Sequence, residues 1–222
     1  MQKILLSVFM VFLFSATVAA EFKWKAIHNL VTRDSLYYEK FTDIPFTGEV
    51  RGLENGNFIG GLKNGFWEVF YDKDKLKSKG NYIHGVQDGP WIWYSPFGQL
   101  EAKGNYIKGK KDGPWVAYFD NGKLRYRGNY SKDMKIGLWV SNFQGGQLEY
   151  KGSYKNTKKD GLWEHYHRIG CLKSKGNYKD GKHDGLWVFY YENCILNFKA
   201  NYKNGIQNIL EIYKENGRPL YE

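Results

Sequence analysis

One spacing dominates this sequence: a tryptophan returns every 24 residues, six times in succession. Each tryptophan has a glycine two residues before it, a leucine nine residues after it and a tyrosine fifteen residues after it. The members are Trp67, Trp91, Trp115, Trp139, Trp163 and Trp187; Leu76, Leu100, Leu124, Leu148, Leu172 and Leu196; and Tyr82, Tyr106, Tyr130, Tyr154, Tyr178 and Tyr202. A fixed period of this length predicts units that stack on copies of themselves to bury a core.

Each unit has the pattern of a β-hairpin. In the unit of Trp115, aromatic and β-branched residues run to Phe119, and Asn121-Gly122 offers the positive-φ residues that a tight turn requires. Strand alternation then predicts one face with Leu124, Tyr126, Gly128 and Tyr130, and an opposite face with Arg125, Arg127 and Asn129. The glycine columns are expected to let the backbone turn or to let a neighbouring ring cover it.

The repeats predict an all-β protein of tandem 24-residue β-hairpins that form one long, twisted, antiparallel meander sheet. The array is expected over residues 43–222, with a shortened first unit at about 43–64, six full units and an atypical last unit at about 205–222. Phe58 takes the tyrosine position of the first unit, and Leu210 takes the tryptophan position of the last. Residues 21–42 are a lead-in without an assigned structure. Exposed sheet edges would allow end-to-end self-association unless the atypical units cap them.

Residues 1–20 have the pattern of a secretory signal peptide. Lys3 precedes an apolar run from Ile4 to Phe14, and small residues lead to Ala20. We expect cleavage after Ala20 and export to the periplasm or the medium; an uncleaved membrane anchor is the alternative. The run is short for a bilayer, and no later segment of the sequence is apolar enough to cross one.

The chain is basic, with a formal net charge of +10, and loss of Lys3 with the leader leaves about +9. This balance favours anionic partners: phospholipid, acidic polysaccharide or acidic protein. Export disfavours intracellular nucleic acid. The alternative is that the charge serves solubility alone.

The candidate binding surface is a column of cations twelve residues after each tryptophan. It contains Lys79, Lys103, Arg127, Lys151, Lys175 and Lys199. By strand parity these side chains point away from the leucine and tyrosine face, at a repeat of roughly 9.6 Å, or two strand spacings. Such a row could match a periodic polyanion or a head-group surface. The alternative is a solvated face whose lysines prevent edge aggregation.

Other candidates are weaker. The tryptophans could stack on sugars or bases, but their regular period favours a core, which leaves Trp93 as a better exposed aromatic. His165, His167 and His183 could approach a zinc ion, but no Cys or carboxylate completes a recognised ligand spacing, so no metal or cofactor is assigned. No catalytic triad or repeated acid–base pair is apparent either.

Cys171 and Cys194 occupy nearly equivalent places in consecutive units. Export would permit a disulfide, whereas equivalent sites about 9.6 Å apart would exceed the limit of roughly 7 Å between bridged Cα atoms. Both cysteines lie near hairpin tips, which could lean together. The geometry argues against the bond, and the pairing stays open.

The unit G-x-x-x-D-G-x-W-x-x-Y-x-x-x-G-x-L-x-x-x-G-x-Y resembles the MORN repeat in its bacterial variant form, most fully from Gly109 to Leu124. Ile136, Asn142, Asp74 and Cys194 depart from the pattern. The resemblance implies a β-hairpin scaffold that binds proteins or membranes. Although some proteins with such repeats carry a kinase name, this chain lacks the phosphate loop and the paired Lys and Asp motifs of a kinase.

Three functional hypotheses follow. The first is an exported, non-catalytic scaffold that binds a protein partner or an anionic envelope or membrane surface. The second is an antitoxin or immunity-type inhibitor that pairs with one effector protein. The third is a carbohydrate-active enzyme that uses exposed aromatics.

Overall fold

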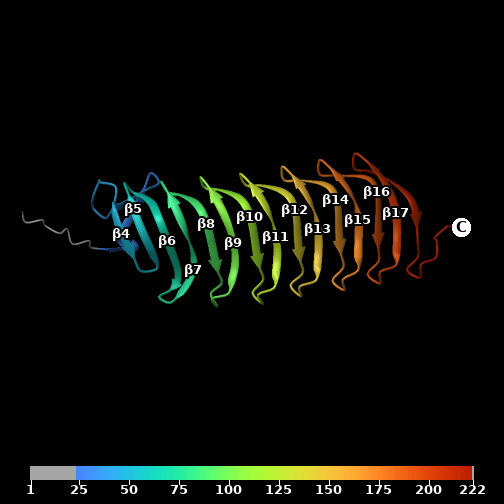
Figure 1. Ribbon diagram of the computed structural model, residues 1–222, viewed down its shortest axis with the longest axis horizontal. Helices are drawn as coiled ribbons and strands as arrows, with labels where there is room; N and C mark the ends of the chain where they lie inside the picture. The colour runs from blue at the N-terminus through green and yellow to red at the C-terminus, as the bar shows by residue number, and fades with distance from the viewer. Residues whose placement is uncertain (1–23, 222) are drawn as a thin grey trace, which may run out of the picture.

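The computed structural model describes residues 24–221, so the leader expected at 1–20 lies outside the described residues. Strands lie side by side across one elongated sheet, with the N-terminal strands at one end and β17 near the other (Figure 1). The sheet has 16 strands, and every consecutive pair from β4 to β18 is antiparallel. The predicted hairpin meander is therefore confirmed. One parallel pair, β1 with β4, extends it at the N-terminal end.

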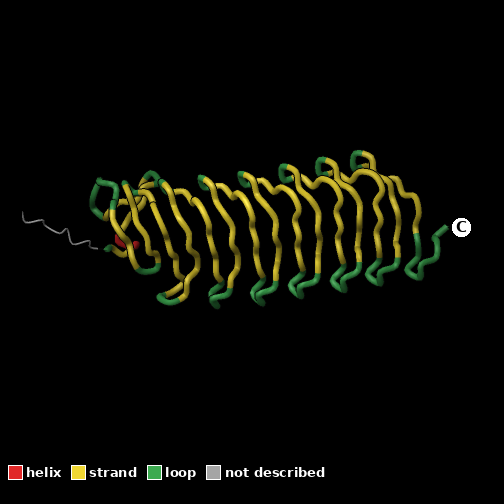
Figure 2. Tube along the Cα trace, viewed as in Figure 1, coloured by secondary structure: helices red, strands yellow, loops and turns green. Residues whose placement is uncertain are grey.

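The strands of the main sheet are β1 Lys25–Ala26, β4 Gly48–Arg51, β5 Glu54–Ile59, β6 Leu62–Asp72, β7 Lys75–Ile83, β8 Val86–Tyr94, β9 Leu100–Ile107, β10 Lys110–Tyr118, β11 Leu124–Ser131, β12 Met134–Asn142, β13 Leu148–Lys155, β14 Lys158–Tyr166, β15 Leu172–Lys179, β16 Lys182–Tyr190, β17 Leu196–Lys203 and β18 Ile206–Ile212. The turns lie along the two long edges of the sheet (Figure 2).

The lead-in covers the N-terminal end of the array. A short 3-10 helix, Ile27–Asn29, precedes a separate hairpin of β2, Leu30–Arg33, and β3, Leu36–Glu39. Leu30 packs in one buried cluster with Phe46, Val50, Phe58 and Trp67, all at most 8% exposed. The first indole of the array therefore has apolar neighbours on its outer side.

Each full unit bends at the glycine that precedes its tryptophan by two residues. These six glycines have φ between 62° and 85°, which side chains other than glycine rarely adopt. In β8, Trp91 pairs with Gly80 and Asp88 with Asn81, so Gly89 and Pro90 have no partner on β7. The result is a bulge, which bends the strand and increases its twist.

The tryptophans form the core, as their period predicts. All six are at most 5% exposed, although the sheet is a single layer. From Trp91 onward, each packs edge-on against the tyrosine that precedes it by nine residues, with ring centroids 5.0 to 5.4 Å apart and planes at 83° to 88°. Contacts to the following tyrosine continue the row at 5.8 to 6.4 Å. Aromatic pairs favour this T-shaped geometry.

The second glycine column lies under the indoles. Gly128 is in register with Trp115, and a Cβ at Gly128 would lie 2.2 Å from Cδ2 of Trp139. Gly80, Gly104, Gly152 and Gly176 lie similarly close to the next tryptophan. Ala200 interrupts the column, and its partner on the last strand is Ile209, where Gly80 and Gly152 have a tryptophan. A methyl group is tolerated there because no indole covers it. The predicted placement of Leu210 in the tryptophan position is therefore wrong, because the bulge of β18 falls at Leu210.

The hairpin turn differs from the expected one. In the unit of Trp115, Phe119 N donates to Lys123 O at 2.9 Å and Gly122 N donates to Phe119 O at 2.8 Å. The loop therefore has three residues, Asp120 to Gly122. Only Gly122, at φ 76°, is left-handed, so the positive φ predicted for Asn121 is wrong. A loop of three residues closed by a left-handed glycine is a common alternative to the two-residue turn.

The strand alternation also breaks once. Tyr126 pairs with Ala117 and Leu124 pairs with Tyr118, so Arg125 is an extra residue in a bulge. Its guanidinium lies 6.0 Å from the ring centroid of Tyr126 rather than beside Arg127. The predicted faces are therefore wrong at Arg125 and at Leu124, because the bulge shifts the side-chain order by one. Leu124 pairs with Tyr118 and lies on the face of Arg127 rather than on that of Tyr126 and Tyr130.

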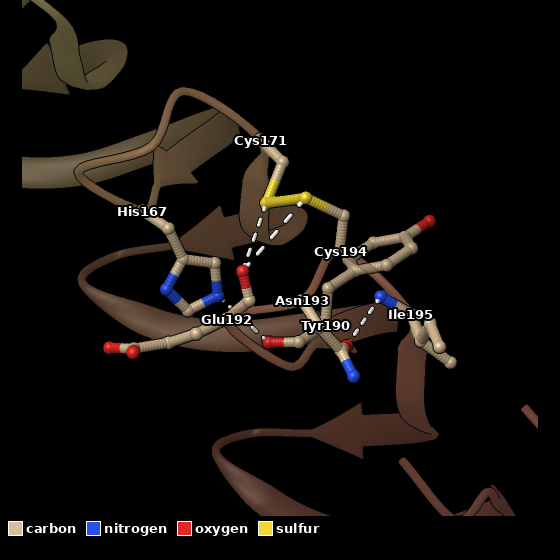
Figure 3. The surroundings of a disulfide bond; sticks show 7 residues. All are labelled: His167, Cys171, Tyr190, Glu192, Asn193, Cys194 and Ile195. Atoms are coloured by element: carbon tan, nitrogen blue, oxygen red, sulfur yellow. Dashed lines mark hydrogen bonds between the residues drawn. A yellow bond between two sulfur atoms is a disulfide. The ribbon is translucent and has the colours of Figure 1, made fainter. Parts of the chain in front are cut away.

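Cys171 and Cys194 form a disulfide, with their Cα atoms 5.7 Å apart (Figure 3). The separation of about 9.6 Å assumed for equivalent sites does not apply, because the residues are offset by one position in their units. This offset brings positions together elsewhere too: a Cβ at Gly146, the counterpart of Cys194, would lie 3.1 Å from Lys123 Cδ, at the counterpart of Cys171. Cys194 adopts the left-handed φ of the turn glycine, 70°.

Candidate functional site

The cation column lies on the face opposite the tryptophans, as strand parity predicts. Its members are in register with the residue that follows each tryptophan: Lys103 lies between Ile92 and Val116, and Arg127 lies between Val116 and Val140. We call this surface, with its cations and their cross-strand partners, the cation face.

Acidic partners neutralise one half of the column. Glu164 lies between Lys151 and Lys175 and bonds both, at 2.7 and 3.0 Å. Glu211 bonds Lys199 at 2.8 Å. Hydrogen bonds from Lys151, Lys175 and Tyr166 hold the pKa of the Glu164 carboxyl at about 2. The C-terminal cations are therefore paired within the sheet.

The central pair of cations is different. Among residues 24–221, no carboxylate lies within salt-bridge distance of Lys103 or Arg127. Both side chains are exposed and line a hollow of about 630 Å³. Apolar residues form most of its wall on this face: Pro90, Ile92, Pro114, Val116, Leu138 and Val140.

An apolar column that sequence reasoning missed accompanies the cations. The residue directly before each tryptophan points to the cation face and is exposed; Leu138 is 57% exposed and Leu186 is 54% exposed. The full column is Phe66, Pro90, Pro114, Leu138, Leu162 and Leu186. Their position one residue from a core tryptophan was the available signal, because neighbours on a strand point to opposite faces.

The tryptophan face carries a second set of cations, also missed. Four residues before their tryptophans, Lys63, Lys111, Lys135 and Lys159 lie over the indole rings at 4.2 to 4.3 Å from the centroids. Burial lowers the pKa of Lys135 and Lys159, and Lys111 lowers that of Lys135 further. This geometry suits a cation–π interaction. These lysines therefore cover the core and are less available to a partner.

Histidines and exposed aromatics do not assemble as a site. His165 Nδ1 lies 3.3 Å from Ser174 Oγ, whereas His167 Nε2 lies 3.0 Å from Tyr190 O and His183 Nε2 lies 2.9 Å from Tyr178 OH. In the part of the chain that the structure describes, no three His, Cys, Asp or Glu side chains group as metal ligands would. Trp93 is half-buried between Trp91 and Trp115, at 5.9 and 5.3 Å.

Comparison with known proteins identifies the repeat. The family model of the MORN repeat variant matches residues 87–108, 111–132, 135–156 and 184–204. These segments begin three or four residues before a tryptophan, and each contains the bulge at the glycine two residues before that tryptophan. No curated protein matched the chain. Within residues 24–221, no helix has the length and apolar character needed to cross a membrane.

Proposed function

Because this chain is built from MORN-variant repeats, which generally serve as binding and scaffold modules, we propose that it is a non-catalytic scaffold that holds a protein partner. The partner would bind the centre of the cation face, over the units of Trp91, Trp115 and Trp139. We further propose that the chain acts after export, in the periplasm or the medium.

One observation carries this proposal: among residues 24–221, three cations of the column have no salt bridge, Lys79, Lys103 and Arg127, and two of them, Lys103 and Arg127, line the apolar hollow. Lys103 and Arg127 lie on either side of Val116 in the sheet, and all three line the hollow. Exposed apolar patches rimmed by polar groups commonly mark protein interaction sites. The complementary surface would present apolar side chains flanked by carboxylates.

A protein partner fits this face better than an anionic membrane or polysaccharide. A periodic polyanion would gain from every cation of the column, but Lys151, Lys175 and Lys199 already bond carboxylates. Glu164 also places negative charge in the middle of that half. A localised apolar hollow with two free cations instead selects a partner of defined shape, since apolar complementarity dominates interface cores.

The antitoxin or immunity-type hypothesis is one form of the same proposal, in which the partner is a single effector protein bound in fixed stoichiometry. Export is supported by the leader-like sequence of residues 1–20 and by the pairing of Cys171 with Cys194. Structural disulfides persist mainly in oxidising compartments. Detection of a mature N-terminal peptide that begins at Glu21 would test export and the cleavage site together.

The binding proposal is tested by quantitative affinity capture from native envelope extract. We compare residues 21–222 of the wild type with Lys103→Glu/Arg127→Glu and with Val116→Asp. Lys179→Glu/Lys203→Glu changes the net charge equally at exposed strand ends outside the hollow and serves as the control. A protein retained by the wild type and the control, but lost at least tenfold by both hollow variants, supports the proposal. Equal retention by all four refutes it.

The membrane alternative has its own outcome. Vesicles that contain an anionic phospholipid are presented to the same four proteins at low and high salt. Vesicle binding that weakens equally in the hollow variant and the control would show that overall charge drives association, because surface electrostatics are screened by salt and insensitive to position. That result, without a captured protein, would replace the protein partner by an anionic surface.

A further inference from the structure

A second hollow, on the tryptophan face, lies near the hairpin tips of the units of Trp115, Trp139 and Trp163. It measures about 440 Å³ and is lined by Phe119, Arg125, Tyr126, Ser141, Asn142, Phe143, Gln144, Glu149, Tyr150 and Arg168. The cation face contributes nothing to it, so it is independent of the proposed protein-binding site.

The hollow coincides with the unit that departs most from the repeat. Ser141 lies in register between Tyr126 and Tyr150, where the next two units have His165 and Phe189. The small side chain of Ser141 between these two tyrosines therefore leaves space on the tryptophan face at this tip.

Bulges direct charged side chains to the same place. Arg125 is the extra residue of β11, and Glu149 is the extra residue of β13. Ser141 Oγ donates to Glu149 Oε2 at 2.8 Å, which holds the carboxylate at the hollow. Bulges recur where proteins re-aim a side chain toward a functional site.

Two guanidinium groups complete the lining. The Arg125 guanidinium carbon lies 5.8 Å from the Phe119 ring centroid, and that of Arg168 lies 5.0 Å from the Phe143 ring centroid. In residues 24–221 neither arginine has a carboxylate within salt-bridge distance. The lining thus offers two free cations and one carboxylate, between aromatic rings.

We propose that this hollow binds an acidic saccharide: a sugar ring that carries hydroxyl groups and one carboxylate. The ligand's carboxylate would accept hydrogen bonds from Arg125 and Arg168, since guanidinium groups bind carboxylates in a planar, bidentate manner. Glu149 would accept hydrogen bonds from ring hydroxyls. The faces of Tyr126 and Tyr150 would contact the apolar C–H surface of the sugar. The hollow lies in the size range of small-ligand sites.

The charge balance argues against other ligands. An amine would meet two cations and one anion, and its binding would be opposed by their net positive charge. A purely apolar ligand would leave Glu149 and the guanidinium groups desolvated without partners. A nucleotide offers an anion and a stacking ring, and it is tested as the competing ligand.

The test is titration of the protein with glucuronic acid, glucose and adenosine monophosphate, followed by saturation-transfer nuclear magnetic resonance. Binding of glucuronic acid at least tenfold tighter than glucose is expected. Arg125→Gln/Arg168→Gln should weaken glucuronic acid binding at least tenfold. Ser141→Phe, which introduces the residue that Phe189 provides in a later unit, should abolish it by filling the hollow.

Lys173→Gln is the matched control, because Lys173 is the exposed bulge residue of the next unit and does not line the hollow. Circular dichroism checks that each variant is folded. If Ser141→Phe does not fold, Arg125→Gln/Arg168→Gln still tests the proposal, because both arginines are exposed. No binding of glucuronic acid, equal binding by the arginine variant, or tighter binding of adenosine monophosphate would overturn the proposal. Loss of protein capture by the cation-face variants leaves it unaffected.

Discussion

A single methyl group at Gly128 should displace a core indole. The Cβ of Gly128→Ala would lie 2.2 Å from Cδ2 of Trp139, whereas carbon atoms pack at about 3.5–4.0 Å. The indole must move by more than an ångström or the strands must separate. Trp139 is 1% exposed, contacts Tyr130 edge-on at 5.0 Å, and donates from Nε1 to Asn129 O at 3.2 Å. Each of these contacts depends on the present ring position.

The expected cost follows from those contacts. Overpacking of a filled site costs about 1–3 kcal/mol. Loss of the indole hydrogen bond costs about 1 kcal/mol, and loss of one edge-on aromatic contact costs about 0.5–1.5 kcal/mol. Reduced freedom of the unfolded chain returns about 0.4–1 kcal/mol when glycine becomes alanine. We therefore expect Gly128→Ala to lower the free energy of unfolding by about 2–4 kcal/mol.

The chain itself contains an alanine in the glycine column, at a place where no tryptophan covers it, and this serves as the control. Ala200 stands in the glycine column where its partner on the next strand is Ile209 instead of a tryptophan, so alanine is expected to be tolerated beside an aliphatic side chain. Urea unfolding, followed by circular dichroism, is measured for Gly128→Ala, Trp139→Leu and the double variant. The methyl group should cost at least about 1 kcal/mol less in the Trp139→Leu background than beside the native indole, a coupling within the usual range for contacting residues. Strictly additive losses would refute the proposed clash.

Three other predictions test separate parts of the structure. Lys123→Cys/Gly146→Cys should form a disulfide detectable by intact mass, since the pair corresponds to Cys171 and Cys194; Lys123→Cys/Gly170→Cys, which skips one unit, should retain free thiols. Lys159→Gln, which mimics Gln87 in the unit of Trp91, should cost about 1 kcal/mol in urea unfolding by removing the cation over Trp163. Burial holds the pKa of His165 at about 4, below its ordinary 6.5, so the folded protein binds fewer protons and loses stability as pH falls from 6.5 to 4. His165→Phe should reduce that loss in pH-dependent thermal unfolding, and an unchanged pH dependence would contradict the assignment.

The sequence was sufficient for the architecture because one period governs the whole core. Trp115, Leu124 and Tyr130 recur in phase, so the hairpin, the stacking direction and the face of Arg127 could be predicted without any long-range information. The roles of the two glycine columns, to bend the backbone and to let a ring cover it, could also be predicted. One bends the strand at Gly113, and the other lies under an indole at Gly128.

The site was less predictable because it depends on register between units. The bulge at Arg125 follows from a three-residue loop, whereas Asn121-Gly122 favours the two-residue turn in isolation. The ion pairs of Glu164 required knowing that the residue after a tryptophan lies between two cations of the column. The disulfide required the one-position offset between neighbouring tips. A single unit, read alone, contains none of these relations.

This division between period and departure explains where specificity can reside. The tryptophan and tyrosine columns cannot vary without loss of core packing, and the cation column is nearly constant, so neither distinguishes one unit from the next. The position after each tryptophan does vary: Ile92, Val116, Val140 and Val188 are apolar, whereas Glu68 and Glu164 are acidic. Because that position is in register with the cations across the sheet, an acid there can pair a cation, as Glu164 pairs Lys151 and Lys175, and an apolar residue leaves Lys103 and Arg127 beside an apolar surface. Val140→Glu should therefore pair Arg127 within the sheet and abolish partner capture, although it reverses no positive charge. Lys179→Glu/Lys203→Glu reverses two positive charges outside the hollow and should leave partner capture unchanged.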